Sequence, residues 1–171
     1  MKRVYLIGMP GSGKSAVGAR LAVLLRLPFV DLDAEIEREA GMTVTQLFAE
    51  KGEPHFRELE SKLLKTWAER PYAFVMATGG GAPCFHDGID TINRSGVSIF
   101  LDVPAKVLAS RIADQQHRPL VQGSDREATL NALLQQRRPV YKAAQYTVTA
   151  EGPPEEVANH IMRWLERNAQ R

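Results

Sequence analysis

The chain has 171 residues, of which 44% are hydrophobic and 25% are charged, and its formal net charge is +2. This length favours one well-buried core over two, and the small net charge without a run of Lys and Arg argues against extended nucleic-acid binding. No apolar stretch approaches the roughly 20 residues that span a bilayer, and the sequence enters its first predicted strand at once. We therefore expect a cytoplasmic protein with no signal peptide and no membrane partner.

The first predicted elements frame a phosphate-binding loop. Residues 3–7 are typical of a short buried strand and residues 16–25 of an amphipathic helix, and between them GMPGSGKS at residues 8–15 fits the pattern G-x-x-x-x-G-K-[ST]. The glycines allow consecutive N–H groups to face phosphate oxygens, and the following helix offers its positive N-terminal end. We expect Lys14 to reach the β- and γ-phosphates of a nucleotide and the Ser15 hydroxyl to ligate Mg²⁺.

The second predicted strand, residues 28–32, ends in two carboxylates, Asp31 and Asp33. Because the two residues are two apart, they would share one face of a continuing strand and project toward the phosphate end of the sheet. Carboxylates there can hold Mg²⁺ or accept a hydrogen bond from a substrate hydroxyl. The alternative that Asp33 only caps the next helix stays open.

The remaining pattern alternates apolar runs with helical periodicity. Helices are predicted over residues 33–40, 44–51, 54–70, from about 104, over 126–136 and over 154–167, and strands over 73–77, 97–101 and 146–149. Such alternation predicts a parallel sheet with helices on both faces, in which ligands bind beyond the carboxyl ends of the strands. The third strand runs into Gly79, Gly80 and Gly81, which either form a flexible exit or let a substrate approach backbone N–H groups.

The pattern alone leaves several polar side chains without a role. Arg57, Arg118 and Arg137 would each by default be solvated surface arginines. Cys84 is the only cysteine, which excludes an internal disulfide, and we interpret it as a packing residue. The four histidines are scattered without ligand spacing, so we expect no dedicated zinc site.

Taken together, the residues resemble the shikimate kinases, which are small P-loop kinases of the nucleoside monophosphate kinase fold. The motifs that carry the resemblance are the loop GxPGSGKS, FxDxD at the second strand, FRxxE at residues 56–60, GGGA at 79–82, RPL at 118–120, and an R-x-P-x-Y pattern placed on residues 137–141. The loop alone fits many ATPases and kinases. The whole set in this order covers essentially the entire chain and is far more specific.

The resemblance implies a three-layer α/β/α fold with a central five-stranded parallel sheet in one domain, residues 1–171. It further implies a substrate-binding helical segment at about 33–61 and a lid at about 112–125. The implied reaction transfers the γ-phosphoryl group of ATP to the 3-hydroxyl of shikimate, giving shikimate 3-phosphate and ADP, with Mg²⁺ as cofactor and a monomer as the expected state. The alternatives are another small-metabolite kinase of this fold, such as a gluconate-type kinase, and an ATP-binding regulatory module without an acceptor.

The resemblance also implies roles residue by residue. The matching ATP-binding positions are Gly11, Ser12, Gly13, Lys14, Ser15, Ala16, Arg111 and Arg118. The matching shikimate-binding positions are Asp33, Arg57, Gly79, Gly80, Gly81 and Arg137, in which the two arginines clamp the carboxylate and Asp33 holds the ring hydroxyls. Ser15 and Asp31 match the metal positions, and the implied catalytic residues are Lys14, Asp33 and Arg118, the last acting from the lid.

Overall fold

A parallel five-stranded sheet forms the centre of the molecule, with the strands in the order β2-β3-β1-β4-β5. The structure is a computed structural model that describes residues 2–113 and 125–169. The strands are β1 (Arg3–Ile7), β2 (Phe29–Asp31), β3 (Val75–Ala77), β4 (Gly96–Asp102) and β5 (Tyr146–Thr149). Val4 of β1 stands opposite Val75 of β3 and Val97 of β4, and all three side chains are buried. These apolar central strands are typical of a parallel sheet covered on both faces.

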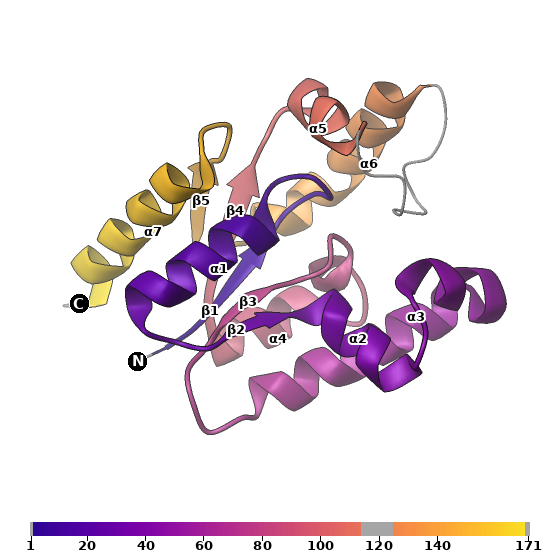
Figure 1. Ribbon diagram of the computed structural model, residues 1–171, viewed down its shortest axis with the longest axis horizontal. Helices are drawn as coiled ribbons and strands as arrows, with labels where there is room; N and C mark the ends of the chain where they lie inside the picture. Colours follow the sequence, from indigo (N-terminus) through magenta and orange to yellow (C-terminus); the bar gives the residue numbers. More distant parts are fainter. Residues whose placement is uncertain (1, 114–124, 170–171) are drawn as a thin grey trace.

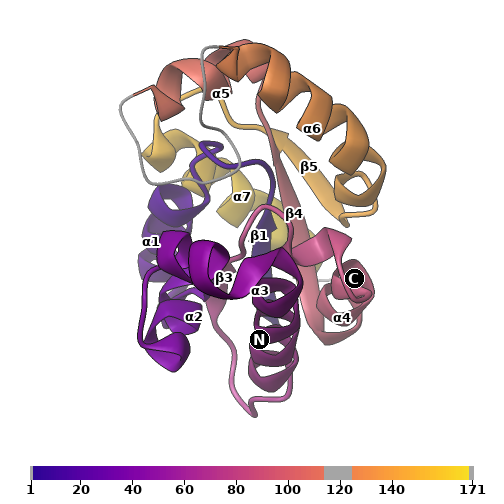
Figure 2. The same ribbon diagram turned by 90° about the vertical axis from the view of Figure 1, so that its right-hand side faces the viewer.

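Helices cover both faces of this sheet. They are α1 (Lys14–Leu25), α2 (Leu32–Ala40), α3 (Val44–Ala68), α4 (Gly88–Ser95), α5 (Ala105–Ile112), α6 (Arg126–Tyr141) and α7 (Pro154–Ala169), with the short 3-10 helix η1 (Ala82–Cys84). Helices α1 and α7 pack side by side (Figure 1), and Figure 2 shows α1 on one side of the strands with α4 and α6 on the other. The predicted three-layer α/β/α architecture with a five-stranded parallel sheet is confirmed.

The predicted and observed elements differ at α3, at α4, at η1, which was not predicted, and at the end of α6, which reaches Tyr141 instead of residue 136. The helices predicted over 44–51 and 54–70 are continuous in α3 except for a kink at Gly52, whose φ of 82° and ψ of 167° interrupt the helical backbone. Pro54 then begins the second part, where its missing N–H is tolerated. Helix α4 was not predicted, because its eight residues carry only two apolar side chains, Ile89 and Ile92, between two glycines.

The order of the strands places a crevice at the end of β1. The chain leaves β1 toward β2 on one side and later returns as β4 on the other, so the carboxyl end of β1 is a topological switch point. The phosphate-binding loop occupies this point. Gly13 there has a φ of 92°, and a Cβ on Gly11 would lie 2.8 Å from Cγ1 of Ile112, so both positions require glycine.

None of the helices within residues 2–113 and 125–169 combines the length and the apolar character that crossing a membrane requires.

Candidate active site

Lys14 begins α1 directly after the phosphate-binding loop, and its ammonium group folds back onto that loop. Its Nζ donates to the carbonyl oxygens of Gly8 and Met9, each at 2.8 Å. The side chain is buried, with 7% of the residue exposed. A positive charge is thereby held at the loop, where the phosphates of a nucleotide are expected.

A cleft of about 480 Å³ extends from the loop. Every described residue predicted to bind ATP lines it: Gly11, Ser12, Gly13, Lys14, Ser15, Ala16 and Arg111. A second wall is formed by Ala150 and Gly152 of the loop between β5 and α7, and by Pro154, which begins α7. Arg118, the remaining predicted ATP-binding residue, lies outside the described residues, as does most of the predicted lid at about 112–125.

Arg111 joins the two walls of this cleft. Its Nη1 donates to the carbonyl of Gly11 at 3.2 Å, and its Nη2 donates to the carbonyls of Ala150 and Glu151, each at 3.1 Å. These bonds span the phosphate-binding loop and the loop before α7. The guanidinium therefore ties these two loops together beside the cleft.

Asp31 and Asp33 both line the cleft, but the predicted shared strand face is wrong. Strand β2 ends at Asp31 and α2 begins at Leu32, so a helix start separates the two carboxylates. The backbone turns here because Asp31 is the N-cap, with Oδ1 accepting from the N–H of Ala34 at 3.2 Å. The capping role that was an alternative for Asp33 thus belongs to Asp31.

The other oxygen of Asp31 meets the predicted metal residue. The hydroxyl of Ser15 donates to Oδ2 of Asp31 at 2.9 Å, and both residues line the cleft. A hydroxyl and a carboxylate are the oxygen ligands that Mg²⁺ prefers in proteins, usually together with water and nucleotide phosphates. The donor set at this position therefore fits Mg²⁺.

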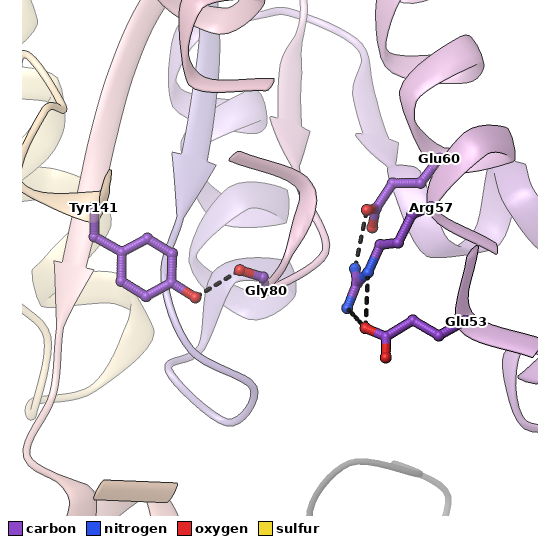
Figure 3. A network of polar contacts seen from close by, with 5 residues as sticks. All are labelled: Glu53, Arg57, Glu60, Gly80 and Tyr141. Carbon is purple, nitrogen blue, oxygen red and sulfur yellow. Dashed lines mark hydrogen bonds and ion pairs between the residues drawn. The ribbon is translucent and has the colours of Figure 1, made fainter. Parts of the chain in front are cut away.

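Arg57 and Arg137 are deeply buried, with 4% and 5% exposure, and so are not the solvated surface arginines of the default interpretation. Figure 3 shows Arg57 of α3 between two glutamates of the same helix. Oε1 of Glu53 accepts from Nε at 3.3 Å and from Nη2 at 3.2 Å, and Oε1 of Glu60 accepts from Nη1 at 3.0 Å. These bonds use three of the five N–H groups of an arginine, which leaves two for a ligand.

The same guanidinium lies over the rings of two aromatic side chains. The Cζ of Arg57 is 4.3 Å from the ring centroid of Phe85 and 5.1 Å from that of Phe56. Attraction between the cation and the rings complements the edge-on bonds to the glutamates. Arg57 is consequently fixed in orientation before any ligand binds. The sequence pattern assigned no role to Phe85, because an aromatic residue in an irregular segment has no distinctive spacing.

The three glycines after β3 run between the arginines and the phosphate-binding loop. A Cβ on Gly80 would lie 2.9 Å from Cδ of Pro10 and 3.0 Å from Nη1 of Arg137, and one on Gly81 would overlap the guanidinium of Arg57. Only glycine lets the backbone approach all three groups at once. Among the described residues, no oxygen accepts from the N–H of Gly80 or Gly81. These two N–H groups are therefore available to a ligand.

Asp33 lies between the nucleotide cleft and the group formed by the two buried arginines and the three glycines. It lines the cleft, and its Oδ1 lies 3.1 Å from the position of a Cβ on Gly79. The same Cβ would lie 2.8 Å from Oε2 of Glu60. A carboxylate thus stands where the cleft, the glycines and the buried arginines meet.

Glu60 is a buried titratable residue that the sequence pattern left without a role. Burial raises the pKa of Glu60 to about 7. The negative charge of Asp33 adds to this rise, whereas the positive charges of Arg57 and Arg137 oppose it. Its Oε2 has no hydrogen-bond partner among the described residues. The spacing of three residues from Arg57 within the FRxxE motif was the available signal, because such pairs face each other on a helix.

Replacing Glu60 with glutamine is expected to change how stability depends on pH. The folded-state pKa of about 7 lies above the ordinary 4.5, so the stability that Glu60 contributes is full below pH 4.5 and is lost as the pH rises through 7. Glu60→Gln removes this titration. Relative to the wild type, the variant should gain on the order of 3 kcal/mol between pH about 4.5 and about 8, as measured by urea unfolding. Glu58→Gln, an exposed neighbour, is the control, and a difference independent of pH would contradict the assignment.

Comparison with protein families identifies a match over most of the chain. The family described as shikimate kinase matches residues 10–166. A shikimate kinase of Aquifex aeolicus is 38% identical over 98% of this chain and 98% of its own length. One of Bacteroides fragilis is 43% identical over 88% of this chain and 86% of its own length.

Comparison with solved structures also finds shikimate kinases. A structure of shikimate kinase from Acinetobacter baumannii in complex with shikimate has a TM-score of 0.93 and 35% identity, and the match covers 98% of this chain and 94% of that one. A gluconokinase from Sinorhizobium meliloti has a TM-score of 0.67 at 19% identity, which is a likeness of fold alone.

Proposed function

The chain belongs to the shikimate kinase family, and from this premise we propose how its residues share the transfer of a phosphoryl group from ATP to shikimate. It is an ATP-dependent kinase whose reaction passes the γ-phosphoryl group to the 3-hydroxyl of shikimate, with shikimate 3-phosphate and ADP as products. The gluconate-type alternative has less support, because the likeness there is confined to the fold. The observation that carries the residue assignments is the position of Asp33 between the nucleotide cleft and the buried arginines.

The nucleotide occupies the cleft with its phosphates in the loop. On binding, the ammonium of Lys14 exchanges the carbonyl oxygens of Gly8 and Met9 for β- and γ-phosphate oxygens. Its charge opposes the negative charge of the phosphoryl group in transfer, for which positioning and electrostatic stabilisation are the main requirements. Arg111 holds the walls of the cleft together around the rest of the nucleotide.

Ser15 and Asp31 hold Mg²⁺, and their mutual hydrogen bond supports this assignment because it brings two suitable oxygens together. The bound ion supplies positive charge to the phosphate oxygens. Asp31 keeps its contact with the N-terminus of α2 through the other oxygen, so the carboxylate is held in place by the helix that it caps.

Shikimate, the acceptor, binds beside the glycine segment and the two buried arginines. Arg57 and Arg137 bind its carboxylate, for which the planar guanidinium suits paired hydrogen bonds. The N–H groups of Gly80 and Gly81 donate to further oxygens of the acceptor. Asp33 accepts a hydrogen bond from the reacting hydroxyl, orients it toward the nucleotide cleft and can take its proton.

The lid at about 112–125 and Arg118 complete the scheme on the strength of the family resemblance. Closure over the site would exclude water and so suppress hydrolysis of ATP, with Arg118 meeting the transferring phosphoryl group. Every assigned residue belongs to one chain, so the proposal needs only a monomer. The use of ATP as phosphoryl donor agrees with a cytoplasmic location for the enzyme.

Replacing Arg57 with alanine tests the acceptor half of this proposal. Because charge-assisted hydrogen bonds contribute roughly 1.5–3 kcal/mol each, shikimate should bind about ten- to a hundredfold more weakly. The affinity for ATP should change less than about twofold, since Arg57 does not line the nucleotide cleft. Calorimetric titration of each ligand measures both, with Arg38→Ala as control because Arg38 is an exposed arginine on α2.

Thermal melting of Arg57→Ala is measured alongside, because Glu60 loses its buried partner in this variant. Intact shikimate binding together with lost ATP binding would show that the placement of the acceptor is wrong.

A further inference from the structure

Tyr141 ends α6, and its buried hydroxyl contacts the backbone of the glycine segment. The hydroxyl donates to the carbonyl oxygen of Gly80 at 2.5 Å (Figure 3), while the ring packs on Phe100 with centroids 5.0 Å apart. Burial raises the pKa of Tyr141, so the hydroxyl keeps its proton at neutral pH and can donate. The residue is 0% exposed and does not contact solvent.

This bond fixes the orientation of the peptide unit that joins Gly80 to Gly81. In a trans peptide the C=O of one residue and the N–H of the next lie in one plane and point in opposite directions. This peptide is the central one of a turn closed by the Ala82 N–H on the Gly79 carbonyl, and between two glycines without a Cβ it can take either of two opposite orientations in such a turn. Holding the Gly80 oxygen on the α6 side therefore directs the Gly81 N–H to the opposite side.

The Gly81 N–H has no described acceptor, and its residue lies against the guanidinium of Arg57. Arg137 precedes Tyr141 by one helical turn, and its Nη1 lies beside Gly80. Helix α6 thus delivers a cation and a hydrogen-bond donor to the same glycine. The Tyr141 hydroxyl also lies 3.8 Å from Sδ of Met9, so it stands between the glycine segment and the phosphate-binding loop.

We propose that Tyr141 is a positioning residue for the acceptor: its hydroxyl fixes the Gly80–Gly81 peptide so that the Gly81 N–H donates to an oxygen of bound shikimate. The inference rests on the proposed placement of shikimate at Arg57 and Arg137. The buried hydroxyl of Tyr141 is engaged with the Gly80 carbonyl and also interacts with Arg137, so Tyr141 acts on the acceptor through these groups. It therefore governs binding of shikimate more than the transfer step.

Tyr141→Phe removes the hydroxyl and keeps the ring. Because one neutral hydrogen bond, such as that from the Gly81 N–H to the acceptor, corresponds to roughly a two- to twelvefold change in affinity, the KM for shikimate should rise by that factor. The KM for ATP should stay within about twofold of the wild type, and kcat should fall less than about threefold, since no group at the phosphates is removed.

The matched control is Tyr5→Phe. Tyr5 is also fully buried, and its hydroxyl lies 2.8 Å from Oγ of Ser95, in a part of the molecule that does not line the cleft. Both variants lose one buried hydroxyl, so both should melt at a lower temperature. Only Tyr141→Phe should weaken shikimate binding, and a shikimate KM equal to that of Tyr5→Phe would overturn the proposal.

A second measurement follows the N–H itself. In ¹⁵N-glycine-labelled enzyme, the Gly81 amide should shift on titration with shikimate in the wild type and in Tyr5→Phe. In Tyr141→Phe that shift should shrink, while signals of the phosphate-binding loop still respond normally to ADP. Equal loss of the shikimate and ADP responses would mark Tyr141 as merely structural and overturn the inference. Wild-type enzyme that fails to form ADP with shikimate would instead overturn the functional premise.

Discussion

Lys14→Met is expected to lower kcat by at least about a thousandfold, because it removes the positive charge that the proposal places on the β- and γ-phosphates. Methionine keeps the unbranched stem of lysine as far as Cε and lacks only the terminal ammonium, so the buried part of the side chain still packs where 7% of the residue is exposed. The buried carbonyls of Gly8 and Met9 lose this donor, so the variant should also melt at a lower temperature than the wild type.

Steady-state turnover with saturating ATP and shikimate measures this effect, and thermal melting verifies that the variant is folded. Lys65→Met is the control, since Lys65 is exposed in the last turn of α3 and lines no part of the cleft. Turnover of Lys14→Met close to that of the wild type would reject the role of the ammonium at the phosphates.

Asp33→Asn is the second variant with a large expected effect. Asparagine keeps the shape but loses the charge that orients the acceptor hydroxyl and can receive its proton, so kcat should fall by roughly a hundred- to ten-thousandfold. ATP should bind nearly as well as in the wild type, because the phosphates are held by the loop and by Lys14. Single-turnover kinetics measure the loss in the rate of phosphoryl transfer, and separate titrations of each substrate measure any loss of binding.

Asp31→Asn is the matched comparison, since the two aspartates differ in their surroundings. Asparagine is as good an N-cap as aspartate, so α2 should still begin at Leu32 and the fold should be retained. The variant should lose mainly its hold on Mg²⁺, and raising the Mg²⁺ concentration should restore part of the activity. The same titration should not restore Asp33→Asn. Rescue of Asp33→Asn but not of Asp31→Asn would show that the two roles are exchanged.

Local patterns were sufficient to predict the five strands, most of the helices and the phosphate-binding loop. The loop motif depends on neighbouring residues alone, and β5 begins and ends at the residues expected, Tyr146 and Thr149. The alternation of strands and helices also predicted the parallel sheet. Its order, with β1 between β3 and β4, depends on pairing between segments far apart in the chain, which no local pattern specifies.

The details of the candidate site depend on tertiary contacts, and there local patterns fail. Asp31 and Asp33 were expected on one strand face, but the free N–H groups of α2 draw Asp31 into a cap. Arg57 sits in a helical run that gives no sign of burial, because Phe85 and the glycines that enclose it come from another segment. The sequence identified Tyr141 only as part of the R-x-P-x-Y motif and predicted no contact for it. Its hydrogen bond joins it to Gly80, which is distant in the chain.

Formation of ADP by the wild-type enzyme tests the account most directly. With Mg²⁺ and ATP, the enzyme should release ADP rapidly when shikimate is added, with one shikimate 3-phosphate formed for each ADP, and only at a slow background rate without acceptor or with gluconate. Equal rates with and without shikimate, or a faster rate with gluconate, would contradict it.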